Sequence, residues 1–284
     1  GIRRLRPARA ARRPAAGGDP TRRVGRRSRS CGTAELTPEG DIMSKVAVIT
    51  GASGGIGAAA ARRLAAQGCY VVLGYCCGKQ RAENLREELW NSGYEACTFG
   101  ADITKPDEAK ALIDFAVREY GHLDILVNNA GISQIKLFTD ITPEDWRKMF
   151  AANVDGIYHC CRAAIPYLVQ QHSGTIINVS SIWGLCGASC EVHYSASKAA
   201  VIGFTQALAK ELAPSGITVN CVAPGAIDTE MNAHLTAEER RLLEEEIPLG
   251  RMGTPEEAAA AIAFLAGEDA RYFTGQVLSP NGGI

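Results

Sequence analysis

Three polar side chains between residues 181 and 198 have types and spacings that suit proton transfer. Tyr194 precedes Lys198 by four residues, and Ser181 lies thirteen residues before Tyr194. Side chains four residues apart on a helix lie on the same face. An ammonium group beside a phenol lowers the phenol pKa from its usual value of about 10. The spacing therefore predicts that Tyr194 is an acid–base group, with Ser181 holding a carbonyl oxygen beside it.

A glycine-rich loop after the first apolar run provides a second functional signal. Gly51, Gly55 and Gly57 have the spacing G-x-x-x-G-x-G, and a helical pattern begins inside the motif. Glycines let backbone N–H groups and a helix N-terminus approach a phosphate closely. No Gly-Lys-Ser/Thr follows, which argues against a nucleoside triphosphate loop. The motif predicts a dinucleotide site, although a tight turn without ligand would have the same composition.

The end of the second apolar run bears on the choice of coenzyme. Many dinucleotide-binding folds place a carboxylate there for the ribose 2′-hydroxyl, but Gly74 and Tyr75 take that place here. Lys79 and Arg81 follow within a few residues. The absence of a carboxylate and the nearby cations favour NADP(H) over NAD(H). Cations at a solvated helix start are the alternative interpretation.

Apolar runs of strand length alternate with longer helical patterns after residue 43. Runs that are apolar throughout are typical of a parallel sheet covered on both faces. The alternation predicts an α/β fold, a Rossmann-type doubly wound parallel sheet of about seven strands, in one domain over residues 44–284. Expected strands span residues 46–50, 70–75, 96–100, 125–128, 175–180, 218–222 and 276–279. Expected helices span residues 56–67, 79–91, 106–120, 143–170 (kinked near Pro166), 192–212 and 255–266. The charged, helical segment 229–251 breaks the alternation, and we interpret it as a substrate lid.

Residues 1–43 differ in composition from the rest of the chain. They hold eleven Arg and four acids, which leaves 19 basic and 27 acidic residues and a net charge of −8 in the remainder. A segment with so few large apolar residues cannot offset its chain entropy by burial, which predicts disorder. A nucleic-acid-binding arm and a transit peptide are alternatives. We favour a dispensable or non-native extension, because "MSKVAVIT" from Met43 leads directly into a strand.

We predict that a chain starting at Met43 folds and works like the full chain, because residues 1–43 contain no motif of the site. Melting temperature and ketone reduction would be compared for the two forms. A large loss of either on truncation would contradict the prediction. A salt-dependent shift of bare DNA that requires residues 1–43 would instead support the nucleic-acid alternative.

The ten cysteines raise the question of disulfides or a metal site. Cys76-Cys77 and Cys160-Cys161 are adjacent pairs, which is poor geometry for a shared tetrahedral site. No secretory signal is recognised before the first strand, and no apolar run reaches the roughly 18 residues of a membrane span. We therefore expect reduced thiols, no metal, no membrane association and a cytoplasmic location.

Taken together, the motifs resemble those of the short-chain dehydrogenase/reductases over essentially all of residues 44–284. They are "TGASGGIG" at 50–57, "NNAG" at 128–131, "AANVDG" at 151–156, "VSS" at 179–181, "YSASK" at 194–198 and "APGAIDT" at 223–229. The resemblance implies that Tyr194 gives a proton to a ketone as hydride leaves the nicotinamide. It implies that Lys198 lowers the Tyr194 pKa and holds the nicotinamide ribose, and that Ser181 positions the carbonyl. Asn153 would anchor a water chain that returns the proton.

The resemblance also implies coenzyme contacts along the cleft. Asn129 would hold the coenzyme against the sheet, Asp102 would contact the adenine, and Ile227 and Thr229 would contact the carboxamide. Three of the implied site residues also have a purely structural interpretation. Asn129 could belong to a plain turn, Asp102 could be a cap, and Asn153 could satisfy backbone groups at a helix irregularity. The expected coenzyme-binding residues are Gly51, Ser53, Gly54, Gly55, Ile56, Gly57, Tyr75, Asp102, Ile103, Asn129, Ala130, Gly131, Tyr194, Lys198, Pro224, Gly225, Ile227 and Thr229.

The resemblance leaves two ketone substrates open. Members with this overall pattern are most often 3-oxoacyl-[acyl-carrier-protein] reductases of fatty acid synthesis, and we place that substrate first. Such enzymes offer basic residues to an acidic carrier, whereas segments 170–175 and 213–216 have no Lys or Arg. Residues 181–195 resemble bacterial reductases of the 5-aminopentanone group on elongation factor P. Glu191 could receive the ammonium of that ketone, or could simply favour a helix start.

One departure from the family pattern and several further expectations complete the sequence-based prediction. Gly54 stands where many ketoacyl reductases carry an Arg for the 2′-phosphate, which weakens the NADP(H) expectation. His193 is interpreted as a pocket wall rather than as a catalytic group. We expect a homotetramer that acts on a small-molecule or carrier-bound ketone and does not bind nucleic acid. A non-catalytic nucleotide-sensing protein is disfavoured, because it would not need the full Asn-Ser-Tyr-Lys set.

Overall fold

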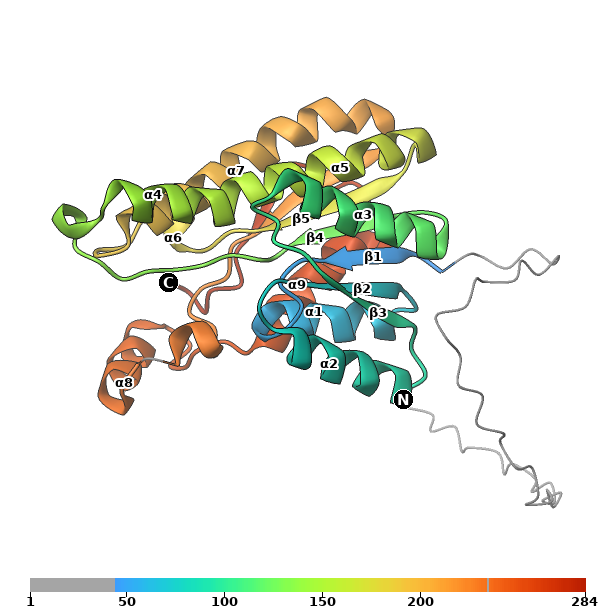
Figure 1. Ribbon diagram of the computed structural model, residues 1–284. Coiled ribbons are helices and arrows are strands. Elements are labelled where there is room, and N and C mark those ends of the chain that lie inside the picture. The colour runs from blue at the N-terminus through green and yellow to red at the C-terminus, as the bar shows by residue number, and fades with distance from the viewer. Residues whose placement is uncertain (1–43, 234) are drawn as a thin grey trace, which may run out of the picture. The chain divides into compact units, whose positions relative to one another are not determined.

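A computed structural model of the chain describes residues 44–233 and 235–284. The expectation of disorder for residues 1–43 lies outside the described residues. Seven strands form one parallel sheet in the order β3-β2-β1-β4-β5-β6-β7 (Figure 1). They are β1 Val46–Ile49, β2 Tyr70–Tyr75, β3 Ala96–Gly100, β4 Ile125–Asn128, β5 Gly174–Val179, β6 Ile217–Val222 and β7 Val277–Leu278. The order confirms the predicted doubly wound α/β fold.

Helices cover both faces of the sheet, as strands that are apolar on both sides require. One face is covered by α1 (Gly55–Ala66), α2 (Lys79–Asn91) and α9 (Pro255–Ala266). The other face is covered by α3 (Pro106–Tyr120), α5 (Gly156–Gln171) and α7 (Val192–Leu212). Figure 1 shows these two groups on opposite sides of the strands. The packing fixes where each helix begins relative to the carboxyl ends of the strands.

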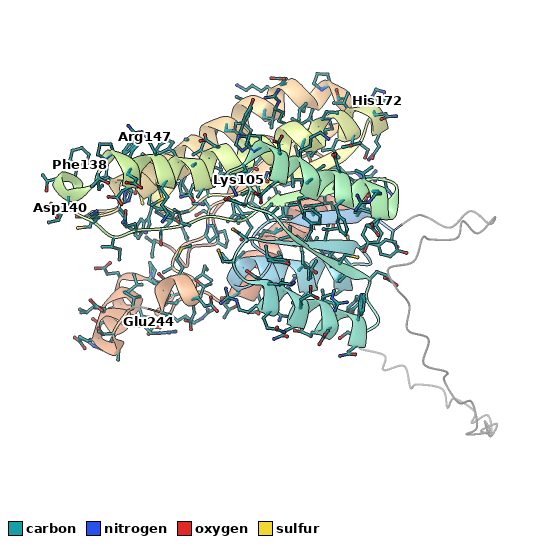
Figure 2. All side chains as sticks on the ribbon, in the orientation of Figure 1. Lys105, Phe138, Asp140, Arg147, His172 and Glu244 are labelled. Atoms are coloured by element: carbon teal, nitrogen blue, oxygen red, sulfur yellow. The ribbon has the colours of Figure 1, made fainter. Side chains whose placement is uncertain are left out.

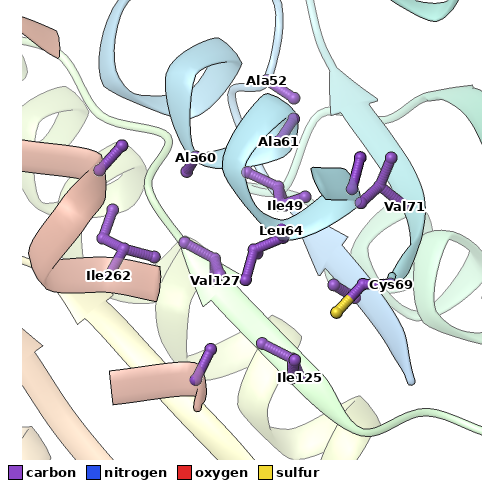
Figure 3. Close-up of a cluster of buried hydrophobic side chains, with 14 of the residues drawn as sticks. Ile49, Ala52, Ala60, Ala61, Leu64, Cys69, Val71, Ile125, Val127 and Ile262 are labelled. Atoms are coloured by element: carbon purple, nitrogen blue, oxygen red, sulfur yellow. The ribbon is translucent and has the colours of Figure 1, made fainter. Parts of the chain in front are cut away.

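Alternate residues of each strand enter two separate cores. On β1, Ile49 packs with Leu64 of α1 and Ile262 of α9, as the close-up in Figure 3 shows. Its neighbour Val48 points to the opposite face and packs in the cluster that contains Ile157 of α5. Burying a side chain of this size stabilises a fold by about 2 kcal/mol. The period of two along β1 therefore attaches helices firmly to both faces of the central strand.

The segment expected as one helix over residues 143–170 is two helices. α4 (Pro143–Phe150) ends in a π-helical turn at Ala151–Asp155, and α5 follows directly. Pro166, where a kink was expected, lies inside α5, which continues to Gln171. The backbone is helical from residue 143 to 171, as expected, but the sequence did not reveal the π turn that divides the segment. Such turns occur often at functional sites.

The segment 229–251 extends from the carboxyl side of the sheet, and its base is closed by a bridge between Ile227 and Gly253. It contains a short 3₁₀ turn at Glu230–Asn232 and α8 (Ala237–Glu246), none of whose residues is buried. Figure 1 shows α8 below the level of the strand ends, and Figure 2 labels Glu244 on it. The helical content agrees with the sequence, and the lid function remains a prediction.

Several properties follow from the described residues alone. No helix among residues 44–233 and 235–284 is both long and apolar enough to cross a membrane. The cysteines of these ranges are free thiols. In the same ranges, no three His, Cys, Asp or Glu side chains are grouped as metal ligands would be.

Candidate active site

A cleft of about 710 Å³ opens at the carboxyl ends of the strands. It lies where the sheet order reverses between β1 and β4, the place at which open α/β sheets bind ligands. Almost every site residue expected from the sequence lines this cleft, from the glycine loop to Lys198. Gly57 and Asn153 are the two exceptions, and both lie one layer behind the surface of the cleft. The structure therefore brings the expected set together.

The glycine loop is packed so tightly that side chains would not fit at two of its positions. Gly51 has φ of +65°, and a Cβ there would lie 2.9 Å from the Ala130 Cα. A Cβ on Gly57 would lie 2.4 Å from the Gly51 carbonyl oxygen and 2.5 Å from the Asn129 Nδ2. These contacts bring the N-terminus of α1 against the ends of β1 and β4. A cradle of bare backbone at a helix N-terminus fits a dinucleotide phosphate.

Asn129 joins the ends of β1 and β4 beneath this cradle. Its Nδ2 donates to the carbonyl oxygens of Thr50 and Gly51, at 3.0 and 3.2 Å. The Thr50 hydroxyl in turn accepts from the backbone N–H groups of Asn129 and Ala130. Asn129 is therefore more than a member of a plain turn, because its amide fixes the floor on which a coenzyme would lie.

The three proposed catalytic side chains come from the chain just after one strand and from one helix. Ser181 follows β5, whereas Tyr194 and Lys198 lie in α7 and face the cleft together. Lys198 Nζ donates to the Val179 carbonyl oxygen at 2.9 Å and lies 5.8 Å from the centre of the Tyr194 ring. All three are at least nine-tenths buried. Burial and the bond to β5 hold the ammonium group in one position relative to the phenol.

The pKa of Tyr194 differs from the sequence-based expectation. Burial raises it to about 12, a hydrogen bond with Ser181 lowers it, and the charge of Glu191 raises it. The expected lowering of this pKa by Lys198 was therefore wrong for the protein alone, because desolvation of the phenolate outweighs the other effects. A phenol with this pKa is protonated at neutral pH, which is the form that can donate a proton to a ketone.

Lys198 has the opposite shift, because its charged form is the protonated one. Burial lowers its pKa to about 8. The ammonium is charged below that pH and can stabilise a phenolate formed on Tyr194. Above that pH the charge is lost while the phenol remains protonated. The two shifts together make Lys198, rather than Tyr194, the group that titrates near the physiological range.

We therefore predict that kcat/KM for ketone reduction falls as the pH rises through about 8. The reason is the loss of the Lys198 charge, and rates between pH 6 and pH 10 would show it. In a Lys198→Arg variant the guanidinium keeps its charge to about pH 12 or above, so the decline should move to higher pH. A profile that stays level to pH 10 in the unaltered protein would contradict this assignment.

Asn153 lies in the π-helical turn between α4 and α5 and is fully buried. Its Oδ1 accepts from the Ile132 N–H at 2.8 Å, and its Nδ2 donates to the Ile132 carbonyl oxygen at 3.0 Å. A Cβ on Gly131 would lie 2.9 Å from Asn153 Oδ1 and 3.3 Å from Lys198 Nζ. Asn153 thus holds the chain after β4 close to Lys198. The helix irregularity is real, and it is what directs this amide inward.

Asp102 and Arg81 both line the adenosine end of the cleft. Asp102 accepts from the Thr104 N–H and hydroxyl, at 3.1 and 2.7 Å, so it does form a local cap, and these bonds lower its pKa. It lines the cleft as well, and the cap leaves adenine contact open as a second role. Arg81 also lines this end, whereas Lys79 is exposed outside the lining. Of the two cations noted in the sequence, the structure places Arg81 alone in the cleft.

The structure also shows contacts that sequence reasoning missed. His193 is fully buried, and its Nε2 lies 2.9 Å from Gln134 Oε1, so it supports the N-terminus of α7 rather than forming a pocket wall. Gln134 Nε2 donates to Asp145 at 3.3 Å. Arg81 forms an ion pair with Glu230 at 2.9 Å. No motif marks Gln134 or Glu230, and only their distant partners reveal them.

Comparison with known proteins agrees with the fold. A family model described as short chain dehydrogenase matches residues 45–240. A 3-oxoacyl-[acyl-carrier-protein] reductase of Staphylococcus aureus is 41% identical over 242 residues, covering 85% of this chain and 98% of the relative. A reductase of the same name from Thermotoga maritima is 40% identical over 240 residues, covering 84% and 97%. An oxidoreductase of Bacillus subtilis named as uncharacterized is 45% identical over 242 residues, covering 85% and 99%.

The chain belongs to the short-chain dehydrogenase family. It is an NAD(P)-dependent oxidoreductase that interconverts C=O and CH–OH groups, and it is similar over most of its length to 3-oxoacyl-[acyl-carrier-protein] reductases. This membership confirms the resemblance found in the motifs. It also removes the non-catalytic nucleotide sensor from the candidate functions.

Proposed function

We propose that the protein reduces the ketone of 3-oxoacyl groups carried by acyl carrier protein, with NADPH as the preferred reductant. The observation that carries the proposal is the convergence of Ser181, Tyr194 and Lys198 in a cleft whose glycine cradle fits a dinucleotide. The acyl substrate is suggested by relatives of that name at 40 and 41% identity. Each coenzyme-binding residue expected from the sequence is part of this proposal.

In the proposed mechanism Tyr194 donates its proton to the ketone oxygen, and Ser181 hydrogen-bonds the same oxygen. Lys198 stabilises the phenolate that remains and holds the nicotinamide ribose. The bound coenzyme supplies the hydride. Asn153 acts one layer behind, where it fixes the chain near Lys198 and would anchor the water that returns the proton to Tyr194.

The preference for NADPH is supported by Arg81. A Cβ on Gly54 would lie 4.0 Å from the Arg81 Nε, so the guanidinium covers the space that the glycine leaves open. The Arg that many ketoacyl reductases carry at position 54 is thus replaced in space by an Arg from α2. A guanidinium is well suited to phosphate, because its N–H groups can form parallel charged hydrogen bonds.

Two cations on α4 support an acidic carrier as partner. Arg147 and Lys148 are exposed and have no ion-pair partner among the described residues, and Lys148 lines the cleft. Figure 2 labels Arg147 on this helix. The segments 170–175 and 213–216 meet in space, since a Cβ on Gly216 would lie 2.6 Å from the His172 carbonyl oxygen, but they supply no Lys or Arg. A carrier would therefore be steered by α4 rather than by those segments.

A second candidate substrate is the 5-aminopentanone group on elongation factor P, and Glu191 is the observation that favours it. Glu191 stands at the N-terminus of α7, three residues before Tyr194, and its charge raises the pKa of Tyr194. A carboxylate there would attract a ketone that ends in an ammonium group. It would repel the phosphate of an acyl carrier arm.

The test compares acetoacetyl-carrier protein with ketone-bearing elongation factor P at equal enzyme and physiological salt. Faster turnover of the acyl substrate, with a several-fold loss in Lys148→Ala and little change in Glu191→Gln, is expected under the first proposal. Faster turnover of the elongation factor, with the loss in Glu191→Gln instead, would replace it with the second. No reduction of either would refute both substrates.

We also propose the homotetramer expected from the sequence. An exposed aromatic group near the end of α9 supports self-association: Phe264 and Phe273 form an edge contact at 5.3 Å, and Tyr272 is fully exposed. Apolar side chains on a monomer surface often mark an interface. Sedimentation of the purified protein would show the state, and a monomer at micromolar concentration would contradict the proposal.

A further inference from the structure

The adenosine end of the cleft is bounded by two parts of the chain that lie far apart in sequence. Arg81 of α2 donates from Nε to the Ser53 carbonyl oxygen at 3.1 Å, which attaches its guanidinium to the glycine loop. From the opposite side Glu230 reaches the same guanidinium, with Oε1 and Oε2 at 3.1 and 2.9 Å from Nη1. Glu230 begins the 3₁₀ turn of the segment 229–251. One cation therefore links the coenzyme site to that segment.

The same cation faces the place where a 2′-phosphate would lie. In this fold the ribose of the adenosine half rests near the end of β2, which is Tyr75 here. The cleft lining next to it includes Cys77, Gly78 and Arg81. A phosphate there would lie next to the Arg81 guanidinium, whose Nη1 is already paired with the Glu230 carboxylate. Two anions would then share one cation, and their mutual repulsion would weaken both contacts.

The Arg81–Glu230 pair is weak enough to be exchanged. The side chains are 54% and 68% exposed, and ion pairs in water contribute little to stability. A phosphate carries more charge than a carboxylate and presents more oxygen atoms to the guanidinium. The hydroxyl of NADH has no such charge and would leave the pair intact.

We propose that Glu230 and the 2′-phosphate of NADPH compete for Arg81, so that NADPH, and not NADH, detaches the Glu230–Asn232 turn from α2. The inference rests on the proposed use of NADPH and adds a residue that lowers the preference for it. Met231 and Asn232 of this turn also line the cleft. Which coenzyme binds therefore decides whether this turn, which forms part of the cleft wall, stays attached to α2.

The experiment measures dissociation constants of NADPH and NADH by fluorescence titration of the full chain. Glu230→Gln should tighten NADPH binding about three- to tenfold and change NADH binding less than twofold. Arg81→Gln should weaken NADPH binding at least about tenfold, and adding Glu230→Gln to it should then have no effect. Glu238→Gln is the matched control, because it removes the same charge from the same segment but pairs with Arg241, away from the cleft.

Hydrogen exchange of the peptide around residues 229–233 gives a second, independent measurement. Saturating NADPH should speed exchange there relative to saturating NADH, and the two should be equal in Arg81→Gln. Unchanged or weaker NADPH binding in Glu230→Gln, or an equal gain for NADH, would overturn the inference. So would identical exchange with the two coenzymes. The unaltered protein's own NADPH-to-NADH affinity ratio tests the proposed coenzyme separately, and ketone turnover tests the proposed substrate.

Discussion

Replacing Tyr194 with phenylalanine is expected to lower the turnover number of ketone reduction at least about 100-fold, the lower range for loss of a general acid. The change keeps the ring that packs in the cleft and removes only the hydroxyl. Coenzyme affinity should change little, because the protonated phenol and the phenyl ring that replaces it are both uncharged. Steady-state kinetics and coenzyme titration of the same preparation would measure both.

The matched control is Tyr158→Phe, which removes a hydroxyl from an exposed tyrosine of α5 whose partner is Arg162. We expect that variant to retain full turnover. Near-normal turnover in Tyr194→Phe would refute the acid–base assignment. Equal losses in the two variants would show that the effect is not specific to the cleft.

Gly57→Ala is expected to have the second-largest effect, and it acts through packing. The new methyl group would lie 2.4 Å from a backbone oxygen of Gly51, so α1 must shift away from the strand ends. Overpacking of this kind costs about 1–3 kcal/mol in the free energy of unfolding. The shift would also open the phosphate cradle, and we expect coenzyme binding to weaken at least about tenfold. Chemical denaturation and fluorescence titration would measure the two effects.

Gly54→Ala is the control within the same loop. Gly54 has an extended backbone with φ of −178°, and the nearest atom to its Cβ position is the Arg81 Nε at 4.0 Å. The free energy of unfolding of the coenzyme-free protein should therefore change by less than about 1 kcal/mol. If the two alanine variants were equally stable, close packing at Gly57 would not be what holds α1 in place.

Much of the fold was predictable because local signals coincide with tertiary ones. β2, α3 and α7 begin and end at the predicted residues. α3, for example, starts at Pro106 and ends at Tyr120, just before Gly121, whose left-handed backbone stops the helix. The π turn after α4 was not predictable, since its extra residue is stabilised by the distant contact between Asn153 and Ile132.

The site was predictable where function imposes a residue type at a fixed spacing, as in the glycine loop and the Tyr194–Lys198 pair. Its electrostatics were not, because the pKa of Tyr194 depends on burial, which spacing does not reveal. Contacts across long sequence separations were also hidden. Arg81 and Glu230 are 149 residues apart, and the pair forms because the turn at Glu230–Asn232 reaches the first turn of α2.

The attachment of Lys198 to β5 has a consequence for how the molecule can change over evolutionary time. Ser181, Tyr194 and Lys198 lie just after β5 and in α7, whereas the glycine loop, Arg81 and Asp102 come from the chain before β4. Changes after β4 can therefore alter the ketone site while the glycine loop stays the same, but a change at Glu230 would still alter coenzyme binding through Arg81. A hybrid gene joined near β4 would combine a glycine loop and a ketone site from different parents, and it would work best where residues 81 and 230 remain a matched pair.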